Sequence, residues 1–225
     1  MGKNKLAKFK EMKGFKNVFE PPMDAIKKDH FALKGKWNED FFENNNPITL
    51  ELGCGKGEYS VNLARKYPNR NFIGIDIKGA RMWRGAKTAL EENLDNVAFL
   101  RTKVEFIDRF FAPGEVDEIW LTFSDPQPKK PNKRLSSRPF VLRYKEILKA
   151  NGVVHVKTDS PLLYEFTCEQ MEAYQYDIIH QTGDVYGNWF DQASKEMQEI
   201  LSIQTHYEKL FSEKGHIITY CAFIP

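Results

Sequence analysis

The sequence predicts an α/β fold with a doubly wound, mostly parallel sheet of seven strands and helices on both faces of the sheet. Short apolar runs of strand length alternate with helix-period segments through the first five strands. A glycine-rich turn follows the first of these runs, and acidic residues end several of them. Such sheets bind ligands outside the carboxyl ends of their strands, so we expect the functional site at that edge.

The chain has 225 residues, of which 41% are hydrophobic, and it is long enough to bury a full core. We expect one domain over residues 21–225, preceded by a basic, flexible arm over residues 1–20. The net charge of +2 says little by itself, because the charges are unevenly placed. Three widely spaced cysteines and no zinc-ligand pattern favour an intracellular protein without a metal. With no signal peptide and no membrane-spanning run, the expected location is the cytoplasm and no membrane partner is expected.

Residues 1–19 of the arm carry six lysines against a single acid, Glu11, with apolar residues interleaved at every third position. One interpretation is a solvated, mobile tail. The other is an arm that closes on nucleic-acid phosphate and docks its apolar residues only then. Pro21–Pro22 ends the arm, and a short ordered segment within residues 37–47 leads into the first strand.

The segment Ile48–Glu58 reads I-T-L-E-L-G-C-G-K-G-E, which predicts a buried strand, a tight turn and the start of a helix. Gly53, Gly55 and Gly57 let the backbone take positive φ and pass close to a flat, polar ligand. Unlike the dinucleotide fingerprint, the turn has a glutamate at its sixth position, and Glu51 precedes it. A carboxylate there suits a ligand with a cationic amine, such as S-adenosylmethionine, better than a pyrophosphate. A purely structural turn is the alternative.

The helix after the turn is expected to end at Pro68–Asn69. The next strand is expected at Asn71–Ile75. That strand ends at Asp76, nineteen residues after Gly57. Doubly wound folds place a carboxylate on ribose hydroxyls at about this separation. Two carboxylates are therefore expected at the ends of neighbouring strands.

A helix with one basic face is expected within residues 81–90, followed by a strand at Val97–Arg101 and a helix at Val104–Phe111. The fourth strand, Val116–Phe123, ends at Asp125. The loop beyond it gathers cations with no acid before Glu146. These cations are Lys129, Lys130, Lys133, Arg134, Arg138 and Arg143. Prolines hold this loop extended, so a polyanion is its natural partner, and a solvated surface loop is the alternative.

Residues 140–148 predict an amphipathic helix, and Gly152–Lys157 predicts a fifth strand that ends at Thr158–Asp159. Ser160–Pro161 predicts the start of another helix, because serine caps helices and proline favours their first turn. Tyr176–Gln181 and His216–Phe223 supply the sixth and seventh strands. The histidines show no ligand spacing and there is no G-x-S-x-G motif, so neither a metal site nor hydrolase chemistry is supported.

Five segments together resemble the bacterial tRNA (guanine-N7-)-methyltransferase family, which has a class I, Rossmann-like S-adenosylmethionine fold. They are E-L-G-C-G-K-G, G-I-D, F-S-D-P-Q-P-K-K-P-N-K-R, K-T-D and T-H-Y-E-K-L-F, and the resemblance spans about residues 48–224. It implies S-adenosylmethionine as cofactor and tRNA as partner. The implied reaction is methylation of guanine N7 in the tRNA variable loop, at position 46.

The resemblance also implies roles for single residues. Glu51, Asp76 and the glycine turn bind the cofactor, and Asp125 lies between cofactor and guanine as a cofactor contact and the catalytic residue. The implied substrate contacts are Lys129, Asp159, Thr205, Tyr207 and Glu208. The implied RNA contacts are Lys130, Lys133, Arg134 and Arg138.

Two positions depart from the family pattern. Lys103 stands near the end of the third strand, where the family often carries an acid that holds the adenine amine, and Glu105 follows two residues later. Gln127 stands where the family usually carries tryptophan.

Guanine N7 has a free lone pair and no proton, so methyl transfer from a sulfonium requires alignment rather than a general base. Positioning can supply about 7–11 kcal/mol in favourable systems. Asp125 would orient the guanine through its exocyclic amine or N1 proton and stabilise the cationic methylated base.

Three other functions compete with this one. A class I methyltransferase with another substrate and a non-catalytic RNA-binding protein of the same fold stay open as alternatives. An NAD-dependent oxidoreductase is disfavoured by Glu51 and by the missing sixth-position glycine. The sequence leaves the oligomeric state, monomer or homodimer, undecided.

Overall fold

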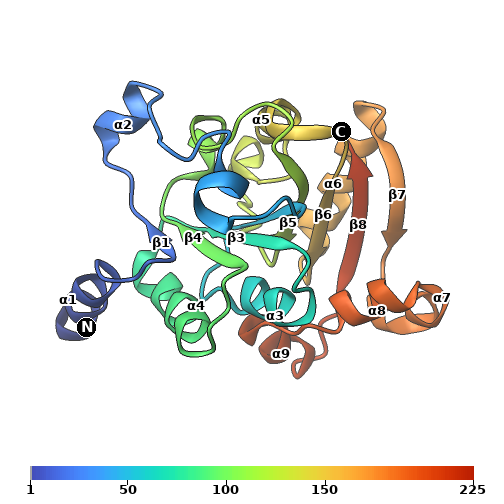
Figure 1. The fold of residues 1–225 in the computed structure, drawn as a ribbon. Coiled ribbons are helices and arrows are strands. Elements are labelled where there is room, and N and C mark those ends of the chain that lie inside the picture. The colour runs from blue at the N-terminus through green and yellow to red at the C-terminus, as the bar shows by residue number, and fades with distance from the viewer. Residues whose placement is uncertain (1) are drawn as a thin grey trace.

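The computed structural model describes residues 2–225, apart from the side chains at positions 2–4, 188 and 207. Within that range the chain forms one eight-stranded sheet in the order β1-β4-β3-β2-β5-β6-β8-β7 (Figure 1). The strands are β1 Val18–Phe19, β2 Ile48–Leu52, β3 Asn71–Ile75, β4 Val97–Leu100, β5 Val116–Thr122, β6 Leu148–Thr158, β7 Asp177–Thr182 and β8 Thr219–Ile224. The first six strands pair in parallel, and β8 runs antiparallel to both β6 and β7.

The mostly parallel α/β sheet is the one that the sequence predicts, with one strand more. The additional strand is β1, which pairs with β4 at the edge of the sheet. Two backbone hydrogen bonds hold it, from Phe99 N to Asn17 O and from Arg101 N to Phe19 O, both of 2.8 Å. A strand of two residues is too short to show an alternating pattern in the sequence.

Helices lie on both faces of the sheet. The α-helices are α1 Gly2–Met12, α2 Met23–Lys27, α3 Glu58–Lys66, α4 Gly79–Glu91, α5 Arg138–Ile147, α6 Pro161–Ala173, α7 Phe190–Gln192, α8 Lys195–Leu201 and α9 His206–Ser212. Four shorter helical segments, of 3-10 or π type, are η1 Trp37–Phe42, η2 Val104–Arg109, η3 Pro131–Lys133 and η4 Val185–Trp189. None of the helices within residues 2–225 has both the length and the apolar character that spanning a bilayer requires.

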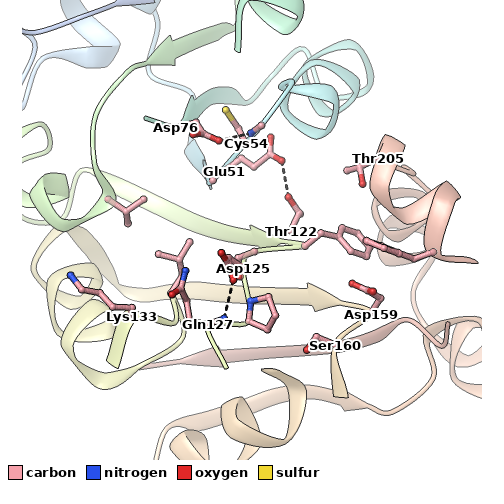
Figure 2. Close-up of a pocket in the computed structure, with 18 of the residues that line it drawn as sticks. Glu51, Cys54, Asp76, Thr122, Asp125, Gln127, Lys133, Asp159, Ser160 and Thr205 are labelled. Carbon is pink, nitrogen blue, oxygen red and sulfur yellow. Dashed lines mark hydrogen bonds between the residues drawn. The ribbon is translucent and has the colours of Figure 1, made fainter. Parts of the chain in front are cut away.

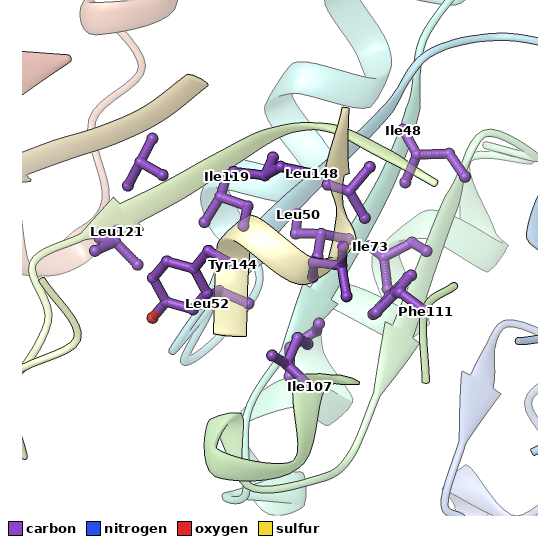
Figure 3. Close-up of a cluster of buried hydrophobic side chains, with 14 of the residues drawn as sticks. Ile48, Leu50, Leu52, Ile73, Ile107, Phe111, Ile119, Leu121, Tyr144 and Leu148 are labelled. Atoms are coloured by element: carbon purple, nitrogen blue, oxygen red, sulfur yellow. The ribbon is translucent and has the colours of Figure 1, made fainter. Parts of the chain in front are cut away.

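Two hydrophobic cores fix these layers, because successive strand residues point to opposite faces. On the α5 face, Leu50 and Leu52 of β2 belong to the same buried cluster as Ile119, Leu121 and Tyr144 (Figure 3). On the other face, side chains of α3, α4 and α8 pack with β3, β4 and β5. The central strands are therefore buried on both faces, and their carboxyl edge is left for a site.

The sequence predicts a flexible arm at residues 1–20, and in the structure several residues between Lys8 and Glu20 contact the domain. Helix α1 contacts α4, and Met12 is 1% exposed. The Phe9 ring lies 4.6 Å from the Arg101 guanidinium carbon. Phe9 and Met12, three residues apart in α1, lie on the side of the helix that contacts the domain, whereas Leu6 is 73% exposed. The division of the chain into an arm and one domain stays a prediction.

Candidate active site

A cleft with a volume of about 1470 Å³ opens at the carboxyl edge of the sheet (Figure 2). Each of the five central parallel strands contributes residues that follow its end. These are Gly53 after β2, Asp76 after β3, Thr102 after β4, Asp125 after β5 and Asp159 after β6. The cleft therefore lies at the edge that the sequence predicts, and it brings residues from distant parts of the chain together.

Glu51, the fourth residue of β2, is 3% exposed at the floor of the cleft. One carboxylate oxygen accepts hydrogen bonds from the backbone N–H and the hydroxyl of Ser60, and the other accepts one from Thr122 Oγ1 at 2.7 Å. Burial raises the pKa of Glu51 to about 7; the hydrogen bonds oppose this shift and the charge of Asp76 adds to it. A cation bound beside Glu51 would favour its ionised form.

The glycine turn has the backbone that the sequence predicts, with φ of 79° at Gly53, 57° at Gly55 and 71° at Gly57. Gly53 and Gly55 line the cleft. Gly57 faces the core instead, because a Cβ there would lie 2.5 Å from the Phe99 ring. Gly57 is therefore required for the close packing of the turn and is not among the residues that line the cleft.

Asp76 lies beside the glycine turn, and its position is fixed by the backbone. Its carboxylate accepts hydrogen bonds from Gly55 N at 2.9 Å and Lys78 N at 2.7 Å. The side chain is only partly buried, so further lone pairs face the cleft. Asp76 can therefore accept hydrogen bonds from ligand hydroxyl groups without losing its own support.

Asp125 is exposed where the chain leaves β5, in a loop with unusual backbone geometry. Phe123 and Gln127 have φ of 49° and 42°, which non-glycine residues rarely adopt. Asp125 Oδ1 accepts a hydrogen bond from Gln127 N at 3.0 Å (Figure 2). This turn fixes the carboxylate at the mouth of the cleft, and Gln127 contributes its backbone where the family usually has a tryptophan ring.

Two hydroxyl groups in the cleft wall are buried without a hydrogen-bond partner among the described residues, Thr102 Oγ1 and Ser124 Oγ. Buried hydroxyl groups in proteins are usually hydrogen-bonded, so both atoms are open to a hydrogen bond with a polar ligand or an ordered water in the cleft. Sequence reasoning missed these two residues. Their position in the sequence could have identified them as site residues, because each directly follows the end of a predicted strand.

The residues expected to contact substrate fall into different environments. Asp159 lines the cleft, and its Oδ2 lies 3.1 Å from His216 Nδ1. Thr205 lines the cleft and caps α9, where its hydroxyl accepts a hydrogen bond from Glu208 N. Lys129 is exposed outside the cleft wall. The side chain of Tyr207 lies outside the described residues.

Glu208 is a correction to the expected substrate contacts, because its side chain is fully buried away from the cleft. It forms an ion pair with Lys157, whose side chain is also fully buried, with an N–O distance of 2.7 Å. Glu208 also accepts a hydrogen bond from the Tyr186 hydroxyl. Both of its carboxylate oxygens are engaged inside the protein, so Glu208 supports α9 and is not among the residues that line the cleft.

The cations of the basic loop also differ in whether they line the cleft. Lys130 and Lys133 line the cleft, and Lys133 Nζ lies 3.2 Å from Glu105 Oε1. Arg138 is exposed at the start of α5, outside the cleft wall. Arg134 is a second correction, because it is 5% exposed and therefore offers little surface to RNA.

Arg134 holds the loop from inside. Its Nε donates a hydrogen bond to Pro126 O at 2.8 Å, and its guanidinium carbon lies 4.4 Å from the centre of the Phe166 ring.

Lys103 and Glu105, the positions that depart from the family pattern, both line the cleft. The part of the chain that the structure describes contains no group of His, Cys, Asp or Glu residues arranged to hold a metal.

Comparison with solved structures defines the class of protein. A 16S rRNA methyltransferase, KamB, superimposes with a TM-score of 0.59 at 16% identity, over 83% of this chain and 92% of its own. A 30S ribosomal A1408 methyltransferase from an uncultured bacterium gives 0.56 at 16% identity, over 85% and 97%. A family described as "Putative methyltransferase" matches residues 45–221. The fold is that of class I methyltransferases.

Curated relatives identify the family. A tRNA (guanine-N(7)-)-methyltransferase from Christiangramia forsetii is 51% identical over 98% of this chain and 97% of its own length. Its counterpart from Bacteroides fragilis is 50% identical over 100% and 86%. The chain belongs to the tRNA (guanine-N7-)-methyltransferase family.

Proposed function

We propose that this protein transfers a methyl group from S-adenosylmethionine to N7 of a guanine in tRNA, at position 46 of the variable loop, in the cytoplasm. The observation that carries the proposal is the grouping of Glu51, Asp76 and Asp125 at the ends of three neighbouring strands in one cleft. Lys130 and Lys133 at the same cleft supply the positive charge that an RNA substrate requires. Relatives about 50% identical carry the name of this activity.

The residues of the cleft fit the cofactor. Its sulfonium supplies an electrophilic methyl group when it is bound. Glu51 would offer a carboxylate to a cationic amine, and Asp76 would accept hydrogen bonds from ribose hydroxyls. Thr102 Oγ1 and Ser124 Oγ would gain the partners that they lack. Gly53 and Gly55 leave room for the ligand to approach the backbone.

Asp125 is the catalytic residue of this proposal. One of its oxygens is held by Gln127 N, so the carboxylate is fixed before the substrate arrives. It would accept hydrogen bonds from the guanine amine or N1–H and stabilise the positive charge that develops on the base. Guanine N7 carries no proton, so methyl transfer to it requires no general base, and Asp125 does not have to act as one.

The remaining contacts belong to the same proposal. Lys129, Asp159 and Thr205 would contact the substrate, and Lys130, Lys133 and Arg138 would contact RNA phosphates. Glu208 and Arg134 are left out because both are buried in contacts within the protein.

Incubation with labelled S-adenosylmethionine and an unmodified tRNA transcript, followed by nucleoside analysis, tests the proposal. We expect 7-methylguanosine as the labelled product. A matched transcript with adenine at position 46 should accept no label. Label in another nucleoside, or equal label in both transcripts, would contradict the proposed target.

A further inference from the structure

A hollow of about 490 Å³ lies on the surface between α1, α4 and the start of α3. Its wall includes Lys8 of α1, Lys56 of the glycine turn, and Arg81, Trp83 and Arg84 of α4. Lys56 and Arg81 also line the active-site cleft, so the hollow adjoins the cleft. We refer to Lys8, Lys56, Arg81 and Arg84 as the α1–α4 surface.

Positive charge gathers around one aromatic ring on this surface. The distances to the ring centre of Trp83 are 4.7 Å from Lys8 Nζ, 5.1 Å from Lys87 Nζ and 5.4 Å from Arg84 Cζ. Contacts between cations and an aromatic ring are attractive, and they offset part of the repulsion among like charges. The cluster still carries more positive charge than its acids balance, which favours binding of an anion.

The acids close to the hollow are already engaged. Glu11 accepts a hydrogen bond from Trp83 Nε1 at 2.8 Å and pairs with Lys87 at 2.7 Å. Both contacts lower the pKa of Glu11, so it stays ionised and bound to its partners. Glu58, which also lines the hollow, accepts a hydrogen bond from His206 N at 2.8 Å.

Three of the cations that line the hollow, Lys8, Lys56 and Arg84, keep most of their charge for a ligand. Within the described residues, no carboxylate forms an ion pair with Lys8, Lys56 or Arg84. Glu11 joins α1 to α4, and this contact places Lys8 at the same Trp83 ring that Arg84 lies against. The folded arm therefore adds charge to the surface instead of covering it.

The position of this surface complements that of the basic loop. Helices α3 and α4 cover one face of the sheet, and the loop with Lys130 and Lys133 leads into α5 on the other face. Both sets of cations adjoin the one cleft. A polyanion that enters the cleft would therefore meet positive charge on both of its flanks.

We propose that the α1–α4 surface binds phosphates of the same tRNA whose guanine enters the cleft. The inference rests on the proposed function and deepens it, because it assigns the tRNA a second contact separate from the basic loop. Lysine and arginine contacts to phosphates position a nucleic acid without reading its sequence. The surface thus fixes how the tRNA lies across the cleft and does not select the base.

The test variant is Lys8→Gln/Arg84→Gln, which avoids Lys56 and Arg81 because they line the cofactor cleft. The matched control is Lys27→Gln/Lys145→Gln, which removes two exposed charges from α2 and α5. These helices lie at the top of Figure 1, whereas α1 and α4 lie at the bottom. The readouts are tRNA affinity across a salt series, KM for tRNA, and S-adenosylmethionine affinity.

We expect the slope of log affinity against log salt to fall by about 0.7–0.9 for each phosphate that the test variant no longer neutralises. KM for tRNA should rise about fivefold or more, with little change in kcat at saturating tRNA or in cofactor affinity. The control variant should match the parent. The charge-retaining variant Lys8→Arg/Arg84→Lys should restore the parental KM, which separates loss of charge from damage to the fold.

A parental salt slope and KM in the test variant would overturn this inference. So would an equal loss in the control variant, because the effect would then reflect net charge and not this surface. Failure of the proposed function would be seen in a different measurement, because the parent enzyme would then form no 7-methylguanosine.

Discussion

Glu51 combines complete burial with a carboxyl group that must be ionised to pair with a cationic ligand. Its pKa is raised from 4.5 to about 7, first by burial, so the folded protein holds a proton that the unfolded chain releases. Below pH 4.5 both states are protonated and Glu51 costs nothing. Above pH 7 both states are ionised, and the folded state carries the cost of a buried charge. Stability is therefore lost as the pH rises through this window.

We predict that Glu51→Gln is more stable than the parent at pH 8 and equally stable near pH 4.5. The shift corresponds to about 3 kcal/mol at about 1.4 kcal/mol per pKa unit, as an upper estimate. Urea unfolding without cofactor, at several pH values, measures the difference. Glu91→Gln, at an exposed position of α4, is the control and should show no such trend. A difference between Glu51→Gln and the parent that does not vary with pH would contradict the shifted ionisation.

Asp125 differs from Glu51, because its charge is expected to lower the free energy of the transition state of methyl transfer. Asp125→Asn keeps the oxygen that accepts from Gln127 N but removes the negative charge. We predict a fall of about 10²-fold in single-turnover methylation, the scale of losing one preorganised electrostatic group. Affinities for cofactor and tRNA should change much less. Asp191→Asn, at an exposed position of α7, should keep the parental rate. If Asp125→Asn also keeps that rate, Asp125 has a structural role.

Helix α9 is held in place by the buried pair Lys157–Glu208. Lys157 Nζ also donates hydrogen bonds to Leu201 O at 2.6 Å and Ile203 O at 3.3 Å. Burial lowers the pKa of Lys157, and Glu208 opposes this shift. The pair lies at the end of β6, and it supports the helix whose first turn is capped by Thr205 in the cleft wall.

We predict that Lys157→Met lowers the free energy of unfolding by about 3–5 kcal/mol, because it leaves Glu208 buried without its cation. Glu208→Leu should cost a similar amount for the converse reason. The double variant should cost clearly less than the sum of the two, since neither charge remains. A double-mutant cycle by denaturant unfolding measures this coupling. Strict additivity would show that the pair contributes nothing as a pair.

Local patterns predict the strands and the carboxylates at their ends, because both depend on short stretches of sequence. Glu51, Asp76 and Asp125 could be placed in this way, since the end of an apolar run is visible without knowledge of the fold. The residues that were misplaced depend on distant partners. Glu208 is paired with a lysine 51 positions away, and Arg134 packs on Phe166 from another helix.

The same limit applies to larger parts of the molecule. Helix α1 is fixed by Glu11 bonding to Trp83, 72 positions along the chain, and β1 is defined only by its pairing with β4. The spacing of apolar residues in the arm favours a helix, but it does not show which part of the domain that helix contacts. Gly57 shows the reverse case: the sequence indicates a special glycine, but only the packed structure shows that Phe99 is the reason.

The whole molecule presents two groups of cations to the cleft, and the basic loop can be tested separately from the α1–α4 surface. We predict that Lys130→Gln/Lys133→Gln weakens tRNA binding and lowers its salt slope by about 0.7–0.9 for each phosphate that is no longer neutralised. The Lys133–Glu105 ion pair is partly exposed, so its removal should cost at most about 1 kcal/mol of stability.

The control is Arg134→Gln, which removes one charge of the same loop from a buried position. Because Arg134 binds Pro126 O and the Phe166 ring, its replacement should lower the unfolding temperature. The salt slope of tRNA binding should remain parental, since the arginine offers almost no surface to phosphate. Salt titrations of tRNA binding, together with thermal unfolding of both variants, measure the contrast. A reduced slope in Arg134→Gln, or an unchanged slope in Lys130→Gln/Lys133→Gln, would show that RNA meets this loop differently from the way its exposed charges indicate.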